Sequence, residues 1–272
     1  FTKYDKFGRQ LYSGLKNNYN KTRADYQSEV DANGSNNEEN DATGFDNSDL
    51  KIYYSKDKAY PSIDISDEVL TVNYYDIYPP DTPTVLPTVV LGQNILSSDL
   101  SLSKNTKTLS TASYTKIIGE NIWDKTYVLY DNKSRPVYTH NINYKGGYTK
   151  VETELDFSST PVSTNTYHKR LSTDPSDIII KERFEYDSSK RLKKYFHKVG
   201  NQEEVLLSDL SYNEIGQLVI NKVGDNLQTI NYNYNIRGWL KSINDPNNLN
   251  DDLFGLILRY NEPVQEENPS SA

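Results

Sequence analysis

Apolar and polar residues alternate along short stretches of this chain, and the alternation predicts β-strands. Within residues 228–234, Ile230, Tyr232 and Tyr234 are separated by asparagines. A period of two places successive apolar side chains on one face of a strand. Further β-prone runs lie at 51–54, 69–76, 181–186 and 217–223. Because the 3.6-residue period of a helix is hard to find anywhere, the pattern predicts an almost wholly β chain.

A short motif follows many of these runs: an aromatic residue, then Asp or Asn, then a turn. We call it the Tyr-Asx motif. Its Asp or Asn side chain can accept backbone hydrogen bonds and so start the turn, and a glycine can supply the positive φ that such turns need. The motif therefore predicts strand–turn–strand as the structural unit. The residues that we expect to act as its structural anchors are Tyr4, Asp5, Gly8, Arg9, Tyr130, Asp131, Tyr186, Asp187, Tyr212, Asn213, Gly216, Tyr234, Asn235, Gly238 and Trp239.

The spacing of the motif is typical of a repeat protein. After the first copy at Tyr4, copies begin at residues 130, 155, 186, 212, 234 and 260, and the copy at 155 is degenerate, with Leu in place of Tyr. Subtracting these positions gives steps of 25, 31, 26, 22 and 26 residues. One hairpin is marginal alone, so stability must come from pairing neighbours into a continuous sheet. We predict a long antiparallel β-hairpin ribbon.

The regularity differs along the chain. Residues 1–114 form an irregular N-terminal portion, and the regular repeats occupy 115–272. Residues 31–49 are nearly devoid of large apolar side chains, which predicts a mobile acidic loop. Residues 79–87 contain four prolines, which end any strand pairing and predict an extended connector.

Composition narrows the classes of function. Hydrophobic residues make up 35% of the chain, mean hydropathy is −0.79, and there are 23 tyrosines. Tyrosine combines an apolar ring with a polar tip, so we expect wide, half-wet β-surfaces. The net charge of −8 argues against nucleic-acid binding, which requires a basic surface.

The chain contains no cysteine, which excludes disulfides and thiolate chemistry. Methionine is also absent, and no signal segment opens the sequence, so we expect it to be part of a longer protein. No apolar run approaches the roughly 20 residues of a membrane helix, and we expect no membrane insertion.

We assign no catalytic, cofactor-binding or metal-binding residue from the sequence. His140, His168 and His197 do not have the spacing of metal ligands. The acidic segments 31–35 and 245–252 match a calcium loop only loosely, so calcium stays an alternative to ordinary turns. Rows of tyrosine could stack on sugars, although we favour cross-strand pairs that hold the sheet together.

At the motif copies the sequence resembles the YD-repeat, or RHS-repeat, family. The resemblance lies in 4–9, in 212–219 and, most specifically, in 232–245, which contains the segment Asn-Ile-Arg-Gly-Trp-Leu. Together with 74–76, this last segment is similar to a branch common in Bacteroidetes surface and secreted proteins. The resemblance implies a β-ribbon that spirals into a hollow shell, which in many family members encloses a variable C-terminal toxin. The family's self-cleavage motif does not occur here, so no cleaving residue is assigned.

The resemblance implies a non-enzymatic shell scaffold of a secreted or surface-exposed protein. Its partners would be neighbouring repeats and a C-terminal toxin or effector of the same polypeptide, with the type IX translocon as secretion machinery if the source is a Bacteroidetes species. A surface adhesion or glycan-binding protein that uses the same ribbon is the alternative, and an enzyme is the least favoured possibility.

Overall fold

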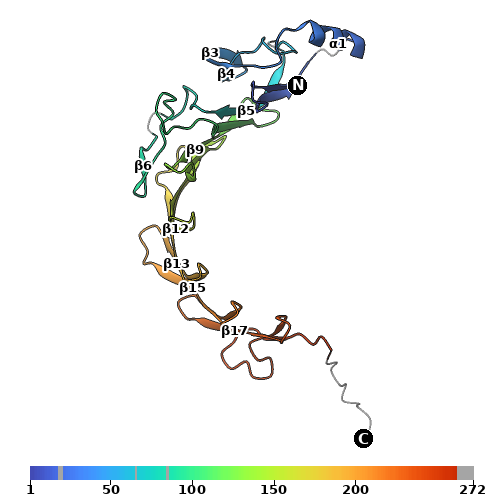
Figure 1. The fold of residues 1–272 in the computed structure, drawn as a ribbon. Coiled ribbons are helices and arrows are strands. Elements are labelled where there is room, and N and C mark those ends of the chain that lie inside the picture. The colour runs from blue at the N-terminus through green and yellow to red at the C-terminus, as the bar shows by residue number, and fades with distance from the viewer. Residues whose placement is uncertain (18–20, 65, 84–85, 262–272) are drawn as a thin grey trace. The chain divides into compact units, whose positions relative to one another are not determined.

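The computed structural model describes residues 1–17, 21–64, 66–83 and 86–261 (Figure 1). It is nearly all β, with 49% of residues in strands and 4% in helix, and 15 of its strands belong to a large antiparallel sheet. The prediction of an all-β antiparallel fold is confirmed. The chain divides into two compact units after Ile179, whereas the sequence pattern suggests a change near residue 114. The two units are described in turn.

In the first unit, eight strands pair in chain order, each antiparallel to the one before. They are β1 (Thr2–Tyr4), β2 (Gln10–Leu15), β5 (Glu68–Tyr75), β8 (Ser110–Lys116), β9 (Trp123–Tyr130), β10 (Pro136–Ile142), β11 (Gly146–Leu155) and β12 (Pro161–Leu171). Most neighbours are joined by short hairpin turns. Two connections are long instead, and they carry the remaining elements of this unit: α1 (Arg23–Ala32), β3 (Asn40–Asn47), β4 (Leu50–Tyr54), β6 (Val89–Val90) and β7 (Gln93–Asn94).

The two insertions supply a second layer for the sheet. The hairpin of β3 and β4 packs Ile52 and Tyr54 against Val72, Tyr74 and other apolar residues of β2, β5, β8 and β9. The hairpin of β6 and β7 contributes Val90 to a smaller cluster on β9 and β10. The buried apolar residues of the chain all precede residue 139 within the part that the structure describes.

Through the larger cluster runs a row of aromatic rings. Its neighbouring ring centroids lie 5.2 to 6.1 Å apart from Tyr12 through Tyr54, Tyr74 and Tyr114 to Tyr127. Tyrosine hydroxyls in the row find partners: Tyr114 donates to Asp81 Oδ1 at 2.7 Å, and Tyr12 donates to the carbonyl of Ser55 at 2.8 Å. Tyrosine therefore builds the core here by satisfying its polar tip at each buried position.

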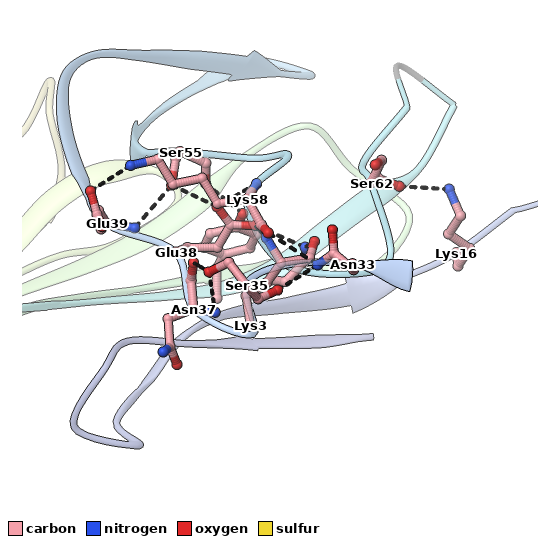
Figure 2. Close-up of polar contacts among 12 residues, drawn as sticks. Lys3, Lys16, Asn33, Ser35, Asn37, Glu38, Glu39, Ser55, Lys58 and Ser62 are labelled. Atoms are coloured by element: carbon pink, nitrogen blue, oxygen red, sulfur yellow. Dashed lines mark hydrogen bonds and ion pairs between the residues drawn. The ribbon is translucent and has the colours of Figure 1, made fainter. Parts of the chain in front are cut away.

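Residues 31–49, predicted as a mobile loop, contain the end of α1 and the whole of β3. The expectation of a loop throughout is wrong, because part of the segment is strand, whereas its mobility stays a prediction. The average composition of the segment does not reveal one buried carboxylate. Glu38 has a side chain with no exposed area, and its Oε1 lies 2.9 Å from Lys3 Nζ (Figure 2). Its Oε2 accepts from Ser55 Oγ at 2.6 Å, and its amide donates to the carbonyl of Tyr4 at 2.9 Å. These bonds attach the acidic segment to the first strand.

Helix α1 also departs from the purely β expectation. It begins with a capping box in which Thr22 and Asp25 bond each other's backbone amides, and it buries no side chain. Such a helix starts from local capping and not from an apolar stripe, so periodicity cannot detect it. In the proline-rich segment 79–87, residues 84–85 lie outside the described residues, and the others contain a turn closed by Thr82 N–H to the Pro79 carbonyl at 3.0 Å but no strand.

The second unit is a sheet of consecutive strands. They are β13 (Ile178–Tyr186), β14 (Leu192–Val199), β15 (Val205–Tyr212), β16 (Leu218–Val223), β17 (Gln228–Tyr234), β18 (Leu240–Ile243) and β19 (Leu256–Ile257). Among the described residues of this unit, Asn244 alone is buried. No element of the described chain covers either face with a second core.

The two faces of this second sheet differ in chemistry. Strand pairing places opposite charges in register across four strands: Glu185, Lys194, Asp209 and Lys222. The other face is mostly apolar and half-buried, and it carries Phe184, Tyr195, Leu210, Ile230, Tyr232 and Ile243. The rings of Phe184 and Tyr195 stack with centroids 5.3 Å apart.

Candidate functional site: the ladder of Tyr-Asx turns

The Tyr-Asx motif closes a hairpin in the same way at each copy. At the first copy, the Asp5 amide donates to the Arg9 carbonyl at 3.0 Å and the Gly8 amide donates back to the Asp5 carbonyl at 3.0 Å. Asp5 Oδ1 accepts from the amides of Phe7 and Arg9, both at 2.9 Å. The side chain thus satisfies the two inner amides of the turn, which explains why Asp or Asn is required there. The same bonding recurs at Asp131, Asp187 and Asn235, and in nearly the same form at Asp156 and Asn213.

The third residue after the Asx has a positive φ in each of these copies. Glycine fills this position at Gly8, Gly216 and Gly238, with φ of 76°, 86° and 79°. Ser134, Ser159 and Lys190 occupy it elsewhere, with φ of 60°, 68° and 61°. Strand register shifts by one residue beside each of the six turns, and the extra residue lies in the strand that follows the turn. A tight turn with a left-handed residue and a bulge is a common hairpin connection.

The structure contains two further copies that the spacing did not reveal. Asn143 makes the same bonds with Gly146 and Gly147 between β10 and β11, although Ile142 stands where the aromatic residue is expected. The other further copy, which is the second along the chain, consists of Tyr75 and Asp76 on one side of an insertion and Thr108 and Leu109 on the other. The Asp76 amide donates to the Leu109 carbonyl at 3.0 Å, and Thr108 has a positive φ of 73°. The signal for it was the Tyr75-Asp76 pair, which lacks a turn residue beside it in the sequence.

Successive copies are bonded to each other through the motif tyrosine. Its hydroxyl donates to the backbone carbonyl of the residue that follows the preceding turn. This bond joins Tyr130 to Ser110 at 2.7 Å in the first unit. In the second unit it joins Tyr212 to Leu192 and Tyr234 to Leu218, both at 2.8 Å, and Tyr260 to Leu240 at 3.0 Å. Tyr4, in contrast, is 44% exposed at the first copy.

A second link runs from the last residue of five of the turns to a later copy. Arg9 forms an ion pair with Asp76 at 2.7 Å and lies 4.6 Å from the centre of the Tyr75 ring. Arg191 lies 4.5 Å from the centre of the Tyr212 ring. Other members of this position reach a later copy too, Arg135 at the Asp156 carbonyl, Gln217 at the Gly238 carbonyl and Trp239 at the Tyr260 ring. The candidate residues therefore form a bonded ladder within each unit.

Three carboxylates of the ladder, those of Asp76, Asp131 and Asp187, are held in their ionised form. Burial raises the pKa of Asp131, but hydrogen bonds from the Arg135 side chain and backbone outweigh it and lower that pKa below its ordinary value. Burial also raises the pKa of Asp76, but the hydrogen bonds and charge of Arg9 outweigh burial, so that this pKa too lies below its ordinary value. At Asp187, hydrogen bonds from the Arg191 backbone and side chain lower the pKa directly. These carboxylates act as fixed acceptors and are poorly suited to exchange protons near neutral pH.

Beside the first copy of the motif lies a cleft of about 770 Å³. The first turn forms one wall, and both insertions of the first unit contribute the others. Phe7 lines it with a ring that is 66% exposed, and Tyr54, Tyr75 and Leu100 add apolar surface. The lining thus combines residues of the first turn with residues of the two insertions, which the other turns lack.

Of the three histidines, only His140 is buried. His140 is buried among the rings of Tyr127, Tyr138 and Tyr148, and burial with a smaller contribution from Lys150 lowers its pKa to about 4. His140 Nε2 is one of the buried polar atoms without a hydrogen-bond partner. No group of three or more His, Cys, Asp or Glu side chains that could hold a metal ion occurs in the described part of the chain. Across those same residues, no helix is long and apolar enough to span a membrane.

Comparison with known proteins adds no assignment. No protein-family model matches the chain, and none of the curated proteins matches it.

Proposed function

We propose that this chain is a non-enzymatic section of the wall of a YD-repeat, or RHS-repeat, β-shell in a secreted or surface-exposed protein. The observation that carries the proposal is the ladder of Tyr-Asx turns, in which copies are bonded to one another by a tyrosine hydroxyl, by the last residue of the turn, or by both. Such nearest-neighbour bonding is how a repeat protein gains stability. The recurring chemistry of the motif builds a continuous sheet.

The unequal faces of the second sheet support a wall. A surface that meets solvent on one side and enclosed protein on the other needs one charged and one mostly apolar face. The row of alternating charges suits the first environment, and the half-buried face with Phe184, Leu210 and Ile230 suits the second. Each opposite-charge pair contributes about 0.2–1 kcal/mol, so the charged row also helps to fix register.

The contents and the route of export follow from the family resemblance. The enclosed partner would be a C-terminal toxin or effector of the same polypeptide, held away from proteases until delivery. Export would use the type IX translocon if the source is a Bacteroidetes species. The repeats themselves would have no catalytic role.

Limited proteolysis of the full gene product tests this proposal. We expect the segment after the repeats to be protected while the shell is intact and to be digested after partial unfolding of the repeats in urea. A gene that encodes a divergent C-terminal domain, followed by a small immunity gene, would agree. A segment digested equally fast with and without urea, or a C-terminal lectin-like module in place of a toxin, would contradict it.

One observation favours the alternative of a glycan-binding surface. Trp239 and Tyr260 are 45% and 48% exposed, and their ring centroids lie 5.1 Å apart. Paired exposed rings can stack on a sugar. A glycan array with the wild-type chain and the Trp239→Ala variant decides the matter, since only a glycan-binding protein would show signals that the variant loses.

A further inference from the structure

The cleft beside the first motif copy is where the fold departs from repetition. The first turn contributes Lys6 and Phe7, and the insertion within the second copy contributes Leu100 and Lys107. The segment before β3 contributes Glu38 and Glu39. Insertions into a repeat commonly carry binding residues, because they can vary without disturbing the sheet.

Every acidic residue that lines this cleft already has a cationic partner. Arg9 bonds to both Asp5 and Asp76, at 2.6 and 2.7 Å. The remaining two acids are paired outside the lining, Glu38 with Lys3 and Glu39 with Lys58. Three cations, Arg9, Lys3 and Lys58, therefore face four carboxylates, which leaves one negative charge of the lining over.

Two lysines of the lining have no such partner. Within the residues that the structure describes, neither Lys6 nor Lys107 forms an ion pair, and Lys6 Nζ lies 5.2 Å from the centre of the Phe7 ring. These two lysines exceed the one carboxylate charge left over, so the cleft together with its ion-pair partners carries a net charge of +1. An anion that enters it gains attraction without displacing an existing ion pair.

The apolar part of the cleft is held in place by the ladder. The Arg9 guanidinium lies 5.1 Å from the centre of the Phe7 ring and 4.6 Å from that of Tyr75, while two carboxylates fix its orientation. A surface ordered in advance loses little entropy when a ligand binds. The volume of about 770 Å³ is in the range of small-molecule sites.

We propose that this cleft binds a small organic carboxylate with an apolar body. The body packs against Phe7, Tyr75 and Leu100, and the carboxylate is held by Lys6 and Lys107. This site is separate from the proposed wall function, because the side chains of Lys6, Phe7 and Lys107 make none of the bonds that link one turn to another among the described residues.

Isothermal titration of the 272-residue chain tests the site with three probe anions: 1-naphthoate, indole-3-propionate and decanoate. We expect at least one to bind at a single site, and its neutral amide to bind at least tenfold more weakly. The double variant Lys6→Gln/Lys107→Gln should lose at least tenfold in affinity for the anion and little for the amide. Phe7→Ser should weaken both, and because Phe7 is 66% exposed this variant should keep the melting temperature.

Lys133→Gln is the matched control. Lys133 also sits in a Tyr-Asx turn, with its Nζ 4.1 Å from the centre of the Phe157 ring, but it lies outside the cleft. The affinity of the Lys133→Gln variant for the anion should equal that of the wild type. The proposal is overturned if none of the three anions binds, if amide and anion bind equally, or if the double variant binds as the wild type does.

Discussion

The two units use the same strand–turn–strand pattern and reach different degrees of burial. In the first, Tyr12, Ile52, Val72, Tyr114 and Tyr127 have no exposed area. In the second, the apolar residues of the strands are half-buried or exposed. The difference comes from the two insertions of the first unit, whose hairpins cover the sheet. The repeats alone therefore form a sheet but no buried core. We expect the stability of the second unit to depend more on its ladder bonds than the stability of the first unit does.

The largest expected effect comes from breaking the buried ion pair that attaches the first insertion. Glu38→Gln leaves Lys3 with the Ala59 carbonyl but without an ionic partner in a fully buried position, which should lower the free energy of unfolding of the first unit by about 3–5 kcal/mol. Chemical denaturation followed by near-ultraviolet circular dichroism, which reports tyrosine packing, measures this change. Glu39→Gln is the control, since its side chain is 66% exposed and its ion pair should matter little. Equal effects of the two variants would show that the pair does not hold the insertion.

A matched pair of core truncations compares the units directly. Ile52→Ala removes a fully buried side chain from the first unit and should cost about 2–5 kcal/mol. Ile230→Ala removes a half-buried side chain from the second and should cost less than half as much. Hydrogen exchange resolved by segment reports each unit separately. A larger effect at Ile230 would mean that the apolar face of the second unit is covered in solution.

Acid should destabilise the first unit through His140. Its pKa falls from 6.5 to about 4 on folding, so the unfolded chain binds the proton first. The stability that neutral His140 gives the folded state is complete above pH 6.5. As the pH falls towards 4, the unfolded chain gains a proton that the folded chain does not bind, and the free energy of unfolding decreases by roughly 3 kcal/mol. Urea denaturation at pH 7 and at pH 4.5 measures it. His140→Phe should remove most of this pH dependence and His168→Gln should leave it intact; an unchanged profile in the His140 variant would refute the assignment.

The smallest expected effect concerns the positive-φ position of the turns. Ser134→Gly should stabilise the first unit by about 0.5–1 kcal/mol, because Ser134 adopts a φ of 60° that glycine tolerates without strain. The reciprocal Gly216→Ser, at a φ of 86°, should destabilise the second unit by a similar or larger amount. Melting temperatures of the two variants provide the measurement. If both changes shift stability in the same direction, the turns of the two units are not equivalent.

The turns could be predicted from sequence because their chemistry is local. Asp131 and Asn235 bond amides two and four residues further along the chain, so the residue types at those positions carry the whole signal. The sequence pattern does not reveal the copy formed by Asp76 and Thr108, because an insertion separates the two residues and only the fold brings them within hydrogen-bond distance. The cleft was missed for the same reason, as its walls come from three separate segments.

The sequence by itself determined the all-β character, the position of most turns and the bonding role of their Asp and Asn residues, because strand alternation and Asx turns depend on neighbours within five positions. The tertiary structure alone decided which tyrosines are buried and that the acidic segment around Glu38 is anchored. It also decided that one unit has a core and the other has an uncovered apolar face. Burial depends on what lies across the sheet, and a charged residue such as Glu38 or Lys3 is stable inside only when its distant partner is there to meet it.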